Sequence, residues 1–124
     1  MSKAKLNTLE SLDGTVSVDV KDIVDVQPIG VGQTWQDMTA MRVLGTTYTN
    51  NTTQPIVVNF KGYNPSSAGR IEMYVGPHRL VDIEIITKNK WTWASVIVPA
   101  GETYRVILPG ADHYWRWHEL RETP

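Results

Sequence analysis

The sequence contains no cysteine, and the features that define several other classes of protein are also scarce. Without cysteine the chain lacks disulfides, thiolate metal sites and cysteine nucleophiles. The 12 Lys and Arg residues nearly balance the 13 Asp and Glu residues, so there is no surplus of positive charge for nucleic-acid phosphates or an anionic membrane. No run approaches the roughly 20 apolar residues of a membrane span, and residues 1–5 lead into no apolar signal-peptide core. We therefore expect no nucleic-acid partner, no membrane insertion and synthesis in a cytoplasm.

Apolar and polar residues alternate with a period of two along most of the chain after residue 14, and no stretch has a clear helical period. A length of 124 residues is typical of one compact domain. Short segments at spacings of roughly 8 to 14 residues predict an all-β fold, an antiparallel β-sandwich of about seven or eight strands with an extended N-terminal arm. The segments with this pattern are 15–20, 42–49, 56–60, 70–75, 80–85, 91–98, 104–108 and 114–120. Segments 42–49 and 56–60 flank a polar turn and are expected to form a hairpin, whereas 15–20 is either a strand or part of the arm.

The N-terminal segment differs from the rest. Leu6, Leu9 and Leu12 recur every three residues among polar ones, a spacing that suits a turn of helix or an anchoring peptide. We divide the chain into an arm or attachment segment, residues 1–28, and a β-sandwich domain, residues 29–124.

The arm is followed by two glycines and a tryptophan. Gly30 and Gly32 lack the helix and lysine that follow a phosphate-binding loop, so we expect a tight bend in front of a strand. Trp35 follows this bend. In a chain with a single Phe, it is expected in the core or at a subunit interface, with a sugar-binding platform as the alternative.

Four further tryptophans form two pairs with a spacing of two, Trp91 with Trp93 and Trp115 with Trp117. Each pair lies on one face of its strand. Together the pairs either make a flat aromatic surface, which suits stacking on sugars, or fill the core or a subunit seam.

Further polar candidates lie on the last strand and in loops. Tyr114, Arg116 and His118 alternate with the second tryptophan pair, so they are exposed if those tryptophans are buried. Three loops are candidate receptor contacts because rigid β scaffolds often bind through loops, although each could equally be a solvated turn. These loops are 66–69, 87–90 with Lys88, and 110–113 with Asp112 and His113.

Three blocks of the chain carry a resemblance to a known family. The first block is Gly30-Val31-Gly32-Gln33-Thr34-Trp35-Gln36-Asp37-Met38-Thr39 with Arg42, Gly45–Asn50 and Gln54–Val58; the others are Val98–Tyr104 and Trp117–Arg121. Residues 29–121 thereby resemble the receptor-binding tip domain of tailed-phage tail fibres. The resemblance implies a β-sandwich, usually a homotrimer, that contacts the host surface, often a polysaccharide. The motif positions that we single out are Gly30, Gly32, Gln33, Trp35, Asp37, Trp117, Glu119 and Arg121.

Enzymatic chemistry has little support in the sequence. The three histidines, His78, His113 and His118, lack metal-site spacing, so we expect no metal and no cofactor. Asp82 and Glu84 share a strand face as a glycosidase pair could, but alternating carboxylates are more often the solvated side of a strand. A small sandwich also offers little room for a deep cleft.

Two functional hypotheses follow. The first is a non-enzymatic phage virion protein, a homotrimeric tail-fibre tip or appendage that binds a host surface polysaccharide, with avidity from several sites. The second is a capsid decoration, head fibre or tail connector that binds other virion proteins through its N-terminal arm and aromatic faces.

Overall fold

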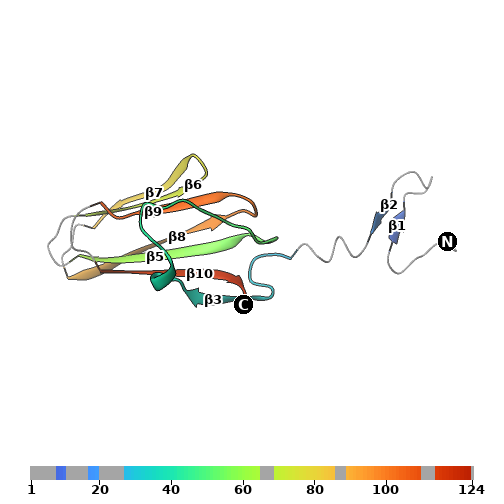
Figure 1. Cartoon of the computed structure of the whole chain (residues 1–124), viewed down its shortest axis with the longest axis horizontal. Helices are drawn as coiled ribbons and strands as arrows, with labels where there is room; N and C mark the ends of the chain where they lie inside the picture. The colour runs from blue at the N-terminus through green and yellow to red at the C-terminus, as the bar shows by residue number, and fades with distance from the viewer. Residues whose placement is uncertain are drawn as a thin grey trace.

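The computed structural model describes residues 8–10, 17–19, 27–64, 69–85, 89–109 and 114–123. Within these residues, eight strands form two four-stranded antiparallel sheets that make up a sandwich (Figure 1). The β5 sheet has the order β3-β10-β5-β8, with bounds Gln33–Asp37, Tyr114–Glu122, Ile56–Asn64 and Lys90–Val98. The β6 sheet has the order β4-β9-β6-β7, with bounds Tyr48–Thr49, Thr103–Ile107, Arg70–Val75 and His78–Glu84. The prediction of an all-β antiparallel sandwich is confirmed.

The remaining two strands lie in the N-terminal segment. β1 (Thr8–Glu10) pairs with β2 (Ser17–Asp19) in a separate two-stranded antiparallel sheet, in which Leu9 lies opposite Val18. The sequence predicts either a strand or part of the arm for residues 15–20, and Ser17–Asp19 form a strand. The turn of helix considered for the leucine segment is wrong at Leu9, because this residue belongs to β1. Leu6 and Leu12 lie outside the described residues.

The alternation in the sequence becomes the inside and outside of the sandwich. In β6 every second residue is buried, namely Ile71, Met73 and Val75. These side chains meet Phe60 and Trp117 of the facing sheet in one hydrophobic core, and the rings of Phe60 and Trp117 are 6.0 Å apart in an edge-on arrangement. Burial of each such side chain contributes about 1.5 to 3 kcal/mol. Within the described residues the only helix is the single 3-10 turn η1 (Thr39–Met41).

The expected hairpin of segments 42–49 and 56–60 is wrong. Only Tyr48–Thr49 of the first segment is a strand, β4, and it pairs with β9, whereas β5 pairs with β8 and β10. The intervening turn connects the two sheets, and Asn50 holds it in this position through two hydrogen bonds to other parts of the chain. Its backbone N–H donates to the carbonyl of Glu102, and its side chain donates to the carbonyl of Val98 at 3.0 Å.

The bend in front of β3 is confirmed, and its conformation requires glycine. Gly30 and Gly32 have φ angles of 96° and 70°, which cost roughly 1 to 2 kcal/mol for residues with a Cβ. Gln33 fixes the bend by accepting the N–H of Gly30 at 2.7 Å and donating to the carbonyl of Pro55 at 2.9 Å. Gln54 donates to the carbonyl of Val31 at 2.9 Å, so the bend and the 50–55 turn hold each other.

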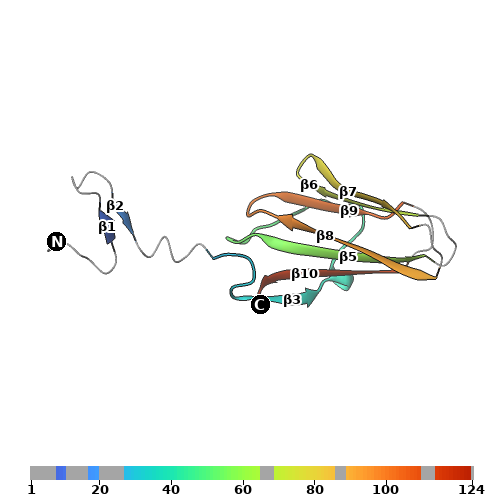
Figure 2. The ribbon, with the colours of Figure 1, turned by 180° about the vertical axis from the view of Figure 1, so that it is seen from behind.

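β10 lies between β3 and β5 in both views of the ribbon (Figures 1 and 2). The chain from η1 to β4 crosses from the β5 sheet to the β6 sheet at the side of the sandwich (Figure 1). This crossing segment carries Arg42 into the space between the sheets, where it meets residues of β9 and β10.

Candidate functional site

The last strand sorts its side chains onto two faces of the β5 sheet. Trp117 and Glu119 are 0% exposed and point into the sandwich. Tyr114, Arg116 and His118 occupy the opposite face, with Tyr114 66% exposed. Tyr114 and Arg116 are exposed, as expected, whereas His118 is half-buried. Their role as receptor contacts stays a prediction.

The two tryptophan pairs lie on opposite faces, so a single surface made of all four is wrong. Trp91 and Trp93 are 43% and 69% exposed, whereas Trp115 packs against the core beside buried Trp117. The pairing register causes the difference. Trp93 lies opposite Lys61 of β5, whereas Trp117 lies opposite the adjacent residue Phe60, and adjacent residues of a strand face opposite ways.

The outer surface of the β5 sheet is organised into four rows that run across the strands. Residues directly opposite one another in neighbouring strands share a face, so the register identifies the members of each row. The aromatic row is Tyr114, Tyr63 and Trp91; the basic row is Arg116, Lys61 and Trp93; the polar row is Asp37, His118, Asn59 and Ser95; the apolar row is Trp35, Leu120, Val57 and Ile97.

The aromatic row is continuous. The ring of Tyr63 lies 5.3 Å from that of Trp91 and 6.1 Å from that of Tyr114. The hydroxyl of Tyr63 donates to the side chain of Asn89 at 3.0 Å, which anchors the middle ring. Such rings present flat apolar surface at low conformational cost.

The basic row places two cations beside these rings. The ammonium of Lys61 lies 5.2 Å from the ring centre of Trp91, within the range of a cation–π interaction. Arg116 donates to the backbone carbonyl of its neighbour Trp115 at 3.1 Å. Sequence reasoning found Arg116 and Trp93 but missed Lys61 and Tyr63, which lie beyond the expected end of their strand at Phe60.

The polar and apolar rows complete the face. His118 lies 4.0 Å from the carboxylate of Asp37, and Asn59 donates to Ser95 at 2.8 Å. The pKa of Asp37 is lowered from its usual value, first by the side-chain hydrogen bond with Thr39 and then by the backbone N–H of the same residue.

Trp35, in the apolar row, is 55% exposed, so its expected place in the core is wrong. It lies opposite Leu120 on the outer face of the edge strand β3, where no second sheet covers it. The subunit-interface and sugar-platform alternatives for Trp35 stay predictions.

The outer surface of the β6 sheet carries several ion pairs, and one further cation, Arg105, lies 4.3 Å from the ring centre of Tyr74. Arg70 donates to Asp82 at 3.0 Å and to Glu84 at 3.3 Å. Arg79 lies 3.5 Å from Asp82 and 3.7 Å from Glu72. The two carboxylates considered as a catalytic pair, Asp82 and Glu84, thus both form ion pairs with arginine.

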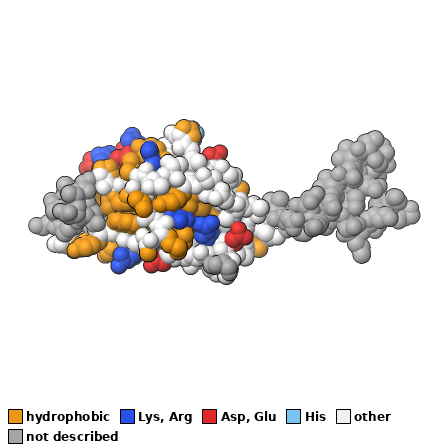
Figure 3. All heavy atoms as spheres, in the orientation of Figure 1, with side chains coloured by type: hydrophobic (Ala, Val, Ile, Leu, Met, Phe, Trp, Pro, Cys, Tyr) orange, Lys and Arg blue, Asp and Glu red, His pale blue; other side chains and the backbone are white. Residues whose placement is uncertain are grey.

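On the face of the molecule seen in Figure 3, basic and acidic side chains are interspersed among hydrophobic ones, without a continuous region of one charge sign.

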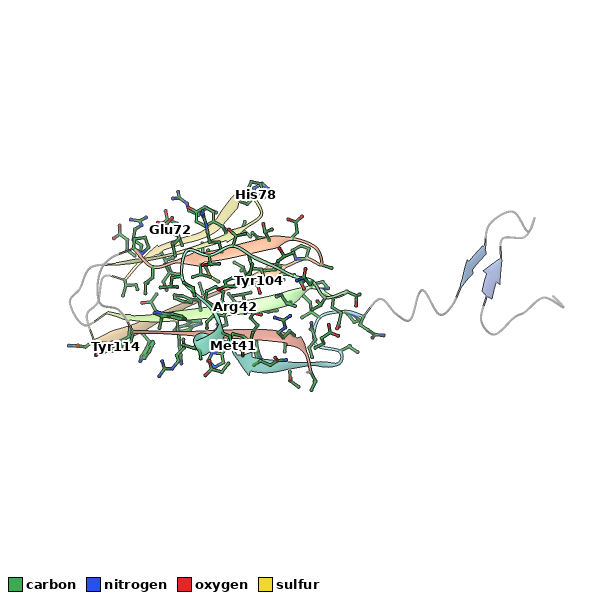
Figure 4. All side chains as sticks on the ribbon, viewed as in Figure 1. Met41, Arg42, Glu72, His78, Tyr104 and Tyr114 are labelled. Atoms are coloured by element: carbon green, nitrogen blue, oxygen red, sulfur yellow. The ribbon has the colours of Figure 1, made fainter. Side chains whose placement is uncertain are left out.

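Three of the motif residues, Trp117, Glu119 and Arg121, belong to a buried network around one carboxylate. Glu119 accepts five hydrogen bonds of 2.8 to 3.1 Å, and these come from Arg42 (two), Tyr104, Trp117 and Arg121. Figure 4 shows Arg42 and Tyr104 between the two sheets. Since Tyr104 belongs to β9 and Glu119 to β10, the network joins the sheets. Trp117 and Glu119 are fully buried and are not available to a ligand, whereas the side chain of Arg121 is 22% exposed.

Burial in this network changes the acidity of its members. Burial raises the pKa of Tyr104 to about 12, and the negative charge of Glu119 adds to the effect. Burial also tends to lower the pKa of Arg42, but its hydrogen bond with Glu119 and the charge of that carboxylate outweigh burial and raise it. Both residues therefore keep their protons at neutral pH. Every buried polar side-chain atom of the described residues has a hydrogen-bond partner.

Three of the sequence-derived candidates, Lys88, Asp112 and His113, lie outside the described residues, as do most residues of their loops. In the described part of the chain, no three His, Cys, Asp or Glu residues group as metal ligands, and no pocket is present. Among the residues that the structure describes, no helix is long and apolar enough to cross a membrane. No protein-family model, curated protein or solved structure matches the chain.

Proposed function

We propose that the chain is a non-enzymatic structural protein of a phage virion, a tail-fibre tip or appendage that adsorbs to a host surface polysaccharide. The observation that carries the proposal is the exposed aromatic row of the β5 sheet, Tyr114–Tyr63–Trp91, with Trp93 beside it. Shallow sites of this kind suit an extended polymer, whose sugar rings stack on aromatic side chains one after another.

The rigid scaffold supports this function. Trp91 and Trp93 belong to a nine-residue strand, β8, that pairs along its whole length with β5. The pairing fixes the backbone positions of both residues, and the ring of Trp91 also packs against Tyr63. Preorganised aromatic contacts lose little entropy on binding. The resemblance of residues 29–121 to tail-fibre tip domains agrees with such a role.

Weak single contacts become strong through repetition. We propose a homotrimer, displayed on the virion and attached to other virion proteins through residues 1–28, so that several copies of the aromatic row engage one polymer. The effective concentration of the second and third sites then raises the apparent affinity by about 10²- to 10⁴-fold.

The test is binding of the labelled chain to a panel of bacterial strains and to their purified surface polysaccharides, with competition against phage adsorption. We expect saturable binding that blocks adsorption, and a loss of about tenfold or more for Trp93→Ala. Leu80→Ala on β7 is the matched control, because Leu80 is 58% exposed on the other sheet. Failure of the folded protein to bind any strain would contradict the proposal and favour the capsid or tail connector.

A further inference from the structure

The two cations of the basic row lack the acidic partners that the other sheet provides. Arg70 and Arg79 on the β6 sheet each contact two carboxylates. Neither Lys61 nor Arg116 forms an ion pair with a carboxylate of the described residues. The aromatic and basic rows contain two cations and no acid. Among the described residues the two rows therefore carry a positive charge in a chain whose net charge is −1. Asp37 of the neighbouring polar row is an acid that acts on Arg116 electrostatically.

The positive charge lies next to the surfaces that suit sugar rings. Lys61 is directly opposite Trp93 in the pairing register, and neighbouring strands are about 4.8 Å apart. Its ammonium also approaches the ring of Trp91. Arg116 is directly opposite Lys61 on the other side. A ligand that stacks on Trp93 thus brings its substituents within reach of both cations.

From this arrangement we infer that the polysaccharide is acidic and carries carboxylates on its sugar units, as uronic and sialic acids do. Such a unit combines an apolar ring face with a negative charge attached to the same ring, which matches an indole and a cation in adjacent strands. The guanidinium of Arg116 suits a carboxylate because its paired N–H donors match the two oxygens. The inference rests on the proposed function and names its substrate class.

The experiment compares each acidic polysaccharide of the panel with its carboxyl-reduced form, in which the backbone is kept and the charge removed. Binding of the intact chain is measured by interferometry at low and high salt. We expect the native polymer to bind about tenfold more tightly than the reduced one, with the difference shrinking at high salt.

Variants assign the effect to the basic row. Lys61→Gln with Arg116→Gln is expected to lower affinity for the native polymer to that for the reduced polymer, whereas Trp93→Ala weakens binding to both. Trp93 is 69% exposed, so its removal leaves the core intact, which circular dichroism verifies. The matched control is Arg79→Gln with Leu80→Ala on β7, which is expected to change neither affinity.

The outcomes separate the inference from the proposed function. Equal binding of native and reduced polymers, or tight binding of neutral polysaccharides only, overturns the acidic ligand and leaves polysaccharide adsorption standing. Absence of binding to every polysaccharide and every strain overturns both. Tighter binding of a single-stranded DNA oligonucleotide than of any polysaccharide also overturns the inference, since aromatic rings with cations can stack nucleobases.

Discussion

At the residue scale, the carboxylate of Glu119 shows how a fully buried charge is accommodated. Two arginines and two neutral donors surround it, so its charge and its lone pairs are satisfied. Removing one partner from such a site costs more than the pair contributes, because the remaining charge stays desolvated. The strict spacing of Trp117, Glu119 and Arg121, every second residue on one strand face, is therefore a requirement of the interior.

Tyr104 provides a test of this network through pH. Because its pKa is about 12 in the folded protein and about 10 in the unfolded chain, its contribution to stability is complete below pH 10 and is lost as pH rises toward 12. We expect Tyr104→Phe to cost about 1 to 2 kcal/mol at pH 7 through loss of the hydrogen bond to Glu119.

The difference in unfolding free energy between the two proteins should then narrow above pH 10, with a limiting slope of about 1.4 kcal/mol per pH unit. It should vanish between about pH 10.5 and 11.5 and change sign above that range, because only the wild-type protein has a tyrosine at this position to ionise on unfolding. Urea denaturation of both proteins from pH 7 to 12 measures this difference. The titration of the lysines affects both proteins equally and therefore cancels in the comparison. A difference that stays constant up to pH 12 would show that Tyr104 is not held in the buried network.

At the scale of elements, the turn at residues 50–55 determines that the chain changes sheets. The side chain of Asn50 is 1% exposed and donates to the carbonyls of Gln54 and Val98. Asn50→Asp removes both donors and buries a charge, so we expect a loss of about 2 to 4 kcal/mol. Asn51→Asp is the matched control, because Asn51 is exposed, and should change stability by less than about 0.5 kcal/mol. Equal unfolding midpoints for the two variants would argue against the structural role of this turn.

Strand positions could be predicted from the sequence, but strand partners could not. Alternation identifies β6 and β10 because each strand buries one face, and this local pattern needs no knowledge of neighbours. The expected hairpin is wrong because the alternation of apolar and polar residues does not indicate which strands pair with each other. The faces of Trp91 and Trp115 depend on register with β5, a contact distant in sequence. Lys61 and Tyr63 were missed because Gly62 interrupts the apolar pattern of the strand. Glycine fits at this inward-facing position because a Cβ would lie only 3.3 Å from the side chains of Ile85 and Leu108.

At the scale of the whole molecule, the apolar row of the β5 sheet is a half-exposed hydrophobic surface. Trp35 and Ile97 are each 55% exposed and lie in one row with Leu120 and Val57. A contiguous apolar surface beside polar neighbours is typical of a subunit interface. We therefore expect the protein to self-associate through this row. The homotrimer that the resemblance implies would have a mass of about three times 14.0 kDa by light scattering.

Substitutions locate the interface if the trimer exists. Ile97→Lys places a charge in the apolar row and should shift the mass toward that of a monomer, because an unpaired charge is costly to desolvate in an interface. Leu80→Lys on the outer side of the β6 sheet should leave the mass unchanged. A monomeric wild-type protein would contradict the trimer itself, whereas a trimer that survives Ile97→Lys would move its interface away from this row. Because the aromatic and basic rows occupy the other end of the same sheet, a trimer formed through the apolar row would leave all three copies of the proposed polysaccharide-binding surface free.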